Sequence, residues 1–69
     1  MKPDEIRKLE AYLKKTFNVS TLQVRARPRK DDSAEVYLGE EFIGVLYRDD
    51  EDEDLSYDFQ MAILEIDLD

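Results

Sequence analysis

The chain has only 69 residues and no cysteine, and these two facts limit what it can fold into. A chain of this length buries only about 60% of the surface that it exposes when unfolded, so its margin of stability is small. Disulfides cannot supplement the core, and the absence of histidine removes the commonest metal ligand as well. We therefore expect a single domain over residues 1–69, with oligomerisation as the natural additional source of stability.

Apolar side chains near the N-terminus recur at spacings of three and four residues, which is the pattern of an amphipathic helix. Pro3 suits the first helical position, and Asn18 suits the left-handed conformation that ends many helices. The pattern predicts a helix over about residues 3–17. Its apolar stripe consists of Ile6, Leu9, Leu13 and Phe17, with Tyr12 beside it.

Four later segments have the patterns of β-strands. Residues 21–27 and 34–38 alternate between apolar and polar side chains, as in strands with one buried face. Residues 42–48 are apolar on both faces, which predicts a central strand covered on both sides. In residues 57–66 the apolar side chains alternate with polar ones, but the alternation shifts by one residue partway along. A bulge near residues 62–64 would allow both parts to place their apolar side chains on the same face.

The connections between these segments predict how the strands are joined. Pro28 ends the first strand because it has no N–H to donate, and residues 29–33 form a polar connector. Gly39 and Glu40 predict a short hairpin turn, whereas Gly44 marks a bulge or a close backbone approach. The expected fold is α+β, an N-terminal amphipathic helix packed on one face of a four-stranded antiparallel sheet in meander order.

The net charge of −8 is unevenly divided along the chain. Residues 1–30 contain nine Lys/Arg and three Asp/Glu, a balance of +6, whereas residues 31–69 contain one and fifteen, a balance of −14. Both halves show regular apolar patterning, which disordered tails lack. We interpret the charges as decoration of one folded unit.

The first residues are followed by an amphipathic run rather than a continuously apolar one, so no signal peptide is expected. No apolar stretch approaches the roughly 18 residues of a membrane span. We therefore expect a cytoplasmic protein with no membrane segment.

The acidic loop at about residues 49–55 contains six consecutive acidic residues from Asp49 to Asp54 and is a candidate calcium site. An EF-hand loop that begins at Asp50 needs glycine in its sixth position and glutamate in its twelfth. The sequence has Leu55 and Met61 there. We interpret the segment as a solvated loop and predict no metal site.

Catalytic chemistry has little support in the sequence. There is no histidine to act as a base, and the serines and threonines are scattered over the expected ends of helices and strands. Carboxylates are so abundant that no pair of them stands out. We predict that the protein is not an enzyme and has no catalytic residues and no cofactor.

A basic group near the first strand is a candidate site for an anionic ligand or a nucleic acid. It consists of Arg25, Arg27, Arg29 and Lys30. The net charge of −8 repels a polyanion at long range, so we do not expect nucleic acid to be the main partner. Pairing with the acidic half of the chain is the alternative role of these residues.

Apolar residues on the strands are too numerous for one helix to cover, so some must face outward or face a partner. Aromatic residues dominate the energetics of interface centres. We predict a protein interface on a tyrosine-rich sheet face, in a homodimer or with another protein. Its candidate residues are Tyr37, Tyr47, Tyr57, Phe59 and Met61.

Four segments of the chain resemble domain-of-unknown-function family 3126, a family of small bacterial proteins. These segments are Lys14 to Asn18, Lys30 to Tyr37, Glu41 to Val45 and Ser56 to Leu64. The most specific is the Phe-Gln-Met-Ala-Ile-Leu run that follows the acidic loop. The resemblance implies a bacterial cytoplasmic protein that consists of this domain alone, and it implies no activity, cofactor or catalytic residue.

Overall fold

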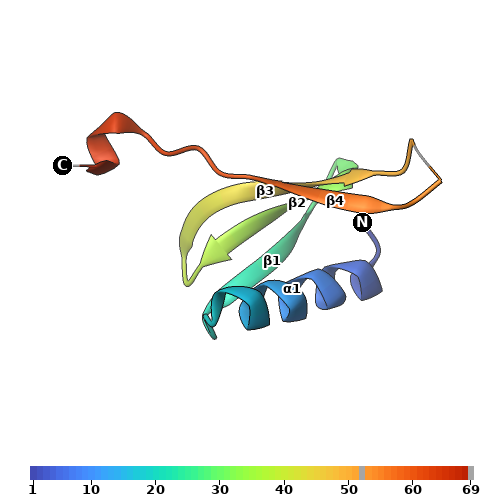
Figure 1. The fold of residues 1–69 in the computed structure, drawn as a ribbon, viewed down its shortest axis with the longest axis horizontal. Helices are drawn as coiled ribbons and strands as arrows, with labels where there is room; N and C mark the ends of the chain where they lie inside the picture. The colour runs from blue at the N-terminus through green and yellow to red at the C-terminus, as the bar shows by residue number, and fades with distance from the viewer. Residues whose placement is uncertain (52, 69) are drawn as a thin grey trace.

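The computed structural model describes residues 1–51 and 53–68. Within them the strands form one antiparallel sheet in the order β1-β2-β3-β4, and α1 lies against one face of it, nearest β1 (Figure 1). This arrangement confirms the expected α+β fold. The elements are α1 (Pro3–Phe17), β1 (Leu22–Arg27), β2 (Lys30–Leu38), β3 (Glu41–Asp49), β4 (Ser56–Gln60) and the 3-10 helix η1 (Glu65–Leu68).

Helix α1 begins and ends at the expected residues. At its start, the Glu5 carboxylate accepts a hydrogen bond from the backbone N–H of Lys2 at 3.1 Å, which satisfies one of the N–H groups that a helix start leaves free. At its end, Asn18 is left-handed with φ 56° and ψ 46°, and the Val19 N–H donates to the Lys14 carbonyl at 3.0 Å. Asn18 therefore stops the helix as predicted.

The core is small and lies between α1 and the helix-facing side of the sheet. Glu10 of α1 adds a polar contact, since its carboxylate accepts a hydrogen bond from the Val24 N–H at 2.9 Å. This contact covers part of the free edge of β1. The buried apolar residues are Leu13, Leu22, Val24, Ala34, Val36 and Leu46.

Gly39 lies in a tight turn and Gly44 lies at a close backbone contact, as the sequence predicted. Gly39 has a φ of +60° in the two-residue turn that joins β2 to β3. At Gly44, a Cβ would lie 2.6 Å from Cε1 of Phe59 and would also meet the Gln60 carbonyl oxygen. A register shift between Val36 and Tyr37 places a bulge in the same stretch of β3, so Gly44 has both expected features.

Two strand boundaries differ from those expected. β2 begins at Lys30 rather than near residue 34, because the chain turns back immediately after Arg27, Lys30 pairs with Arg27, and Ser33 pairs with Tyr47 of β3. β4 ends at Gln60 rather than at residue 66, so no strand or bulge occupies residues 62–64. Residues 61–68, which we call the C-terminal arm, leave the sheet and run away from it (Figure 1).

The prediction that β3 is covered on both sides is wrong. β3 does lie inside the sheet, between β2 and β4, but α1 covers only one sheet face. On the other face Phe42 is 50% exposed and Tyr47 is 38% exposed. Apolar character on both faces of a strand therefore does not by itself show that both faces are covered.

Candidate protein-interaction surface

The register of the sheet assigns each candidate residue to a face, because residues directly opposite each other in an antiparallel pair project to the same side. Leu46 is buried against α1 and pairs with Phe59, and Arg48 pairs with Tyr57. These pairs therefore face the helix. Tyr47 alternates with Leu46 along β3 and faces the opposite side, which we call the outer face.

The structure divides the five candidate interface residues into three groups. Tyr37 and Tyr47 lie on the outer face. Tyr57 and Phe59 lie on the helix face, where both are half-buried. Met61 lies in the C-terminal arm and is 52% exposed. The idea of one continuous tyrosine-rich face is therefore wrong, because Tyr57 alternates with the residues that face outward.

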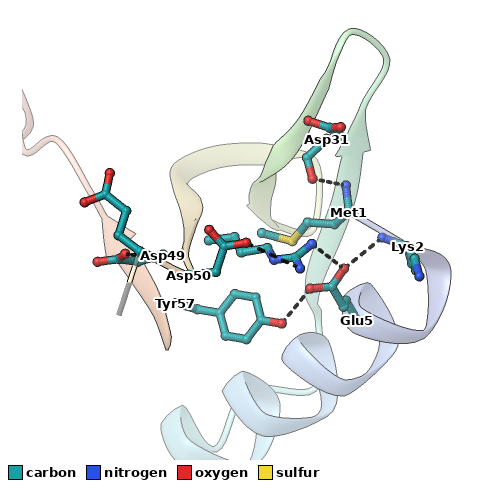
Figure 2. Close-up of polar contacts among 9 residues, drawn as sticks. Met1, Lys2, Glu5, Asp31, Asp49, Asp50 and Tyr57 are labelled. Atoms are coloured by element: carbon teal, nitrogen blue, oxygen red, sulfur yellow. Dashed lines mark hydrogen bonds and ion pairs between the residues drawn. The ribbon is translucent and has the colours of Figure 1, made fainter. Parts of the chain in front are cut away.

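Tyr57 instead joins a polar cluster at the start of α1, which Figure 2 shows. Its hydroxyl donates a hydrogen bond to Oε2 of Glu5 at 2.6 Å. The same carboxylate lies 3.6 Å from the Arg48 guanidinium through Oε1, and Arg48 also lies 3.7 Å from Asp50. The cluster therefore connects the start of α1 with β3, β4 and the beginning of the acidic loop.

The contacts of this cluster change the acidity of two groups. The hydrogen bond from Tyr57 is the main cause that lowers the pKa of the Glu5 carboxyl below its ordinary value, followed by the bond from the Lys2 N–H. The bond to Glu5 also raises the pKa of the Tyr57 hydroxyl. Glu5 is thus charged and Tyr57 is neutral at neutral pH, as a structural hydrogen bond between them requires.

The N-terminus completes this end of the molecule. The Met1 ammonium group donates to the Asp31 carbonyl at 2.7 Å (Figure 2). Sequence analysis missed the whole cluster, because Glu5 and Tyr57 are separated by 52 residues and no local pattern links them. We interpret it as a structural connection, since every contact in it joins parts of the same chain.

Three aromatic residues with an arginine form a patch on the outer face, and we call Tyr37, Phe42 and Tyr47 the outer aromatic patch. The rings of Tyr37 and Phe42 meet edge to face, with centroids 5.6 Å apart and an interplanar angle of 71°. The Arg25 guanidinium lies 3.9 Å from the Tyr37 centroid, in cation–π contact. The Tyr37 hydroxyl also donates to the Glu35 carboxylate at 3.2 Å, so the patch is amphipathic, with a positive and a negative side chain beside Tyr37.

The four basic residues predicted as an anion site do not converge. Arg25 stacks on Tyr37 as described, whereas Arg27 lies 3.3 Å from the Ser33 hydroxyl and 4.0 Å from the Glu35 carboxylate. Arg29 and Lys30 are exposed where β1 turns into β2. The group thus provides scattered positive charge rather than one pocket.

The C-terminal arm is the most exposed apolar segment of the structure. The exposure of its large apolar residues is far above that of the buried core residues. Soluble monomers rarely leave a contiguous apolar segment of this kind uncovered. The exposed residues are Met61 at 52%, Ile63 at 65%, Leu64 at 59%, Ile66 at 76% and Leu68 at 72%.

A groove of about 840 Å³ separates the arm from β3. On one side it is lined by the first half of β3 with Tyr47, and on the other by the end of β4 and the arm as far as Asp67. Phe42 and Tyr47 of the outer aromatic patch belong to this lining. The arm, the groove and the patch therefore form one continuous surface, which we call the arm surface.

Other candidate sites have less support. Among residues 1–51 and 53–68, no group of three or more acidic side chains is placed to hold a metal ion. Asp52, in the middle of the predicted acidic loop, lies outside the described residues. In that same part of the chain, no helix has the length and apolar character needed to cross a bilayer.

Comparison with known proteins identifies a family. Residues 5–67 match the family model described as "Protein of unknown function (DUF3126)", a range that includes most of α1, all four strands and most of the arm. No curated protein and no solved structure matches the chain. Because the match covers nearly all of the 69 residues, the chain belongs to the DUF3126 family.

Proposed function

We propose that the protein is a non-enzymatic interaction module that binds a protein partner through the arm surface. The observation that carries this proposal is the exposed arm, in which five large apolar side chains are each more than half exposed. Burial of apolar surface contributes roughly 25 cal/mol per Å². An arm that is covered by a partner therefore gains free energy that it cannot gain within one chain.

The outer aromatic patch supports the same proposal. Aromatic side chains and arginine are enriched at the centres of protein interfaces, and Arg25 on Tyr37 combines the two. Phe42 and Tyr47 connect the patch to the groove beside the arm. A partner that covers the arm therefore also reaches aromatic anchors.

A non-catalytic role is supported by the character of the polar cluster. Glu5, Arg48 and Tyr57 hold parts of the chain to one another, since their contacts join α1 to β3 and β4. We also propose that the protein acts in the bacterial cytoplasm, as the family resemblance implies.

Binding of an anionic ligand or nucleic acid through Arg25, Arg27, Arg29 and Lys30 has weaker support. Arg25 and Arg27 are held on the outer face by Tyr37, Ser33 and Glu35, and the net charge is −8. No observation in the structure favours this alternative over the arm surface.

The proposal is tested by site-specific photo-crosslinking in cells that produce the full chain. A benzophenone amino acid in place of Ile66 is expected to form an adduct with a discrete protein, because Ile66 is 76% exposed in the arm. The control places the same group at Tyr12, which is 64% exposed on α1, away from the arm surface. The same pattern of adducts from both positions would contradict the proposal.

A further inference from the structure

The first half of β3 has a free edge. β4 pairs with β3 only from Val45↔Gln60 to Asp49↔Ser56, so residues 41–44 pair with no strand on that side in the described part of the chain, although the Gln60 carbonyl oxygen lies against Gly44. Unpaired N–H and C=O groups on an edge are a template for another strand. This edge is open at the groove, which residues 41–45 line.

The C-terminal arm contains a segment that matches this edge. Residues 61–64 follow β4 directly and have no regular structure, and η1 begins only at Glu65. They are four residues long, and the free stretch of β3 also has four residues, of which Ile43 and Gly44 share one pairing position at the bulge. Their sequence, Met-Ala-Ile-Leu, is apolar throughout and contains neither proline nor glycine, so every residue can pair in a strand.

We infer that residues 61–64 of one copy of the chain pair as a strand with residues 41–44 of a second copy, and that the second copy's arm pairs with the first in the same way. This inference rests on the proposed function and names the partner that covers the arm. It also explains why β4 ends at Gln60 within one chain while its sequence continues as an apolar strand.

The bulge in β3 determines the register of this pairing. Two β3 residues, Ile43 and Gly44, lie opposite Val36 of β2, since Val36 pairs with Gly44 and Tyr37 pairs with Phe42. A strand on the other edge of β3 meets the same bulge. Continuing from the Val45↔Gln60 pair places Met61 opposite the bulge and Ala62 opposite Phe42.

This register places Met61 beside the half-buried Ile43 and places Ile63 directly opposite Glu41. Side chains alternate along a strand, so Met61 and Ile63 project to the helix face, as Phe59 does. On that face Ile43 is half-buried and Leu38 is 37% exposed. The incoming arm therefore covers the part of the helix face that α1, which packs on β1, leaves open.

A second copy fits the groove because the chain carries both the groove and the segment that fills it. The groove lies between β3 and the arm, so an arm inserted from the second copy contacts β3 on one side and the first copy's arm on the other. When each copy inserts its arm into the groove of the other, one two-fold axis relates the two copies and both grooves are filled. No groove is left free for a third copy, as a closed dimer requires.

Electrostatics make a specific prediction for this dimer. Each copy carries a net charge of −8, and Glu41 and Asp67 border the groove. The proposed contacts are backbone hydrogen bonds and apolar burial. We therefore expect the dimer to tighten as salt screens the repulsion between the copies.

The mass of the full chain in solution is the first test. Light scattering after size exclusion is expected to give about twice 8.2 kDa, with a larger dimer fraction at high salt. Met61→Asp is expected to give a monomer with an unchanged circular dichroism spectrum, because Met61 is 52% exposed within one chain. Tyr12→Asp, the matched control on α1, is expected to remain a dimer.

Cysteine crosslinking tests the register, since the chain has no native cysteine. When Phe42→Cys and Ala62→Cys chains are mixed and oxidised, we expect a disulfide-linked dimer, whereas Tyr12→Cys mixed with Ala62→Cys gives none. A chain that carries both Phe42→Cys and Ala62→Cys distinguishes the alternative. If it forms an internal disulfide at monomer mass while the mixture gives no dimer, the arm folds back on its own β3 and the inference is wrong.

The two proposals fail separately. A monomer at every concentration and salt, with no disulfide between mixed chains, would refute the exchange of arms between copies. An Ile66 adduct with a protein of different sequence would still support the interaction module. Absence of any adduct at Ile66, together with a monomer mass and no disulfide between mixed chains, would refute both.

Discussion

The role of the Tyr57 side chain becomes clear only when its neighbours in the folded chain are known. In the sequence it belongs to a series of strand aromatics, yet its hydroxyl donates to Glu5 across the interface between α1 and β4. Hydrogen bonds to charged groups contribute more than neutral ones, but the partial exposure of both residues reduces the effect. The bond is therefore a modest but directional connection between the first helix and the last strand.

We predict that Tyr57→Phe lowers the free energy of unfolding by about 1 kcal/mol at neutral pH. The pKa of Glu5 is lowered in the folded state, so its contribution is present above the unfolded pKa of glutamate and is lost as the pH falls through the folded pKa. The pKa of Tyr57 is raised, so its contribution is lost as the pH rises through that folded value.

Urea unfolding of the wild-type protein and of Tyr57→Phe across pH measures this effect. The difference between the two is expected to be greatest near neutral pH and to shrink in acid, where Glu5 is protonated, and in strong alkali. Tyr12→Phe, at an exposed position on α1, is the control and is expected to show no such pH-dependent difference. A Tyr57→Phe effect that is constant from neutral to acid pH would exclude the role of the Glu5 carboxylate.

At the scale of single elements, the ends of α1 are determined locally and the end of β4 is not. Pro3, Glu5 and Asn18 act through neighbours within a few residues, so a sequence pattern is sufficient to find them. β4 ends at Gln60 although apolar residues continue beyond it, because strand formation depends on a partner strand rather than on propensity alone. The arm is the consequence of that missing partner.

We predict that Asn18→Ala lowers the free energy of unfolding by about 1 kcal/mol, since Ala has a higher cost than Asn in the left-handed conformation that ends α1. Asn18→Gly is the matched control and is expected to have little effect or a small stabilising one, because glycine adopts positive φ without strain. Both are measured by urea unfolding followed by circular dichroism. Equal losses for the two variants would mean that the Asn18 side chain matters more than its backbone.

At the scale of the whole molecule, the small core and the high net charge both limit the stability of the folded chain. Six buried apolar residues form the core of the chain, and the net charge of −8 opposes a compact state. Five large apolar residues stay exposed in the arm. Covering the arm with a partner, as we propose, would add stability that so short a chain cannot obtain from its own core.

We predict that sodium chloride raises the melting temperature at neutral pH, because it screens the repulsion among the acidic residues. Calcium chloride at equal ionic strength is expected to give the same shift, since no group of acidic side chains in residues 1–51 and 53–68 is placed to hold a metal. Thermal unfolding followed by circular dichroism in the two salts makes the comparison. A shift with calcium well beyond that with sodium would instead indicate a divalent-cation site.

The sequence alone determined the features that depend on short range. Helical periodicity located α1 from Pro3 to Phe17, and Gly39 located the turn between β2 and β3. Alternation located β1 and placed Leu22 and Val24 on its buried side. Each of these follows from the conformational preferences of residues close together in the chain, and so does the order of elements that defines the α+β fold.

The tertiary structure decided everything that depends on which residues meet across the fold. It moved Tyr57 and Phe59 to the helix face, because the register of β4 on β3 sets their direction. It also brought Arg25 onto Tyr37 and Glu5 to Tyr57, pairs that no local pattern links. Above all, it left residues 61–68 without a partner, because whether an apolar segment becomes a strand depends on an edge that the segment cannot supply itself.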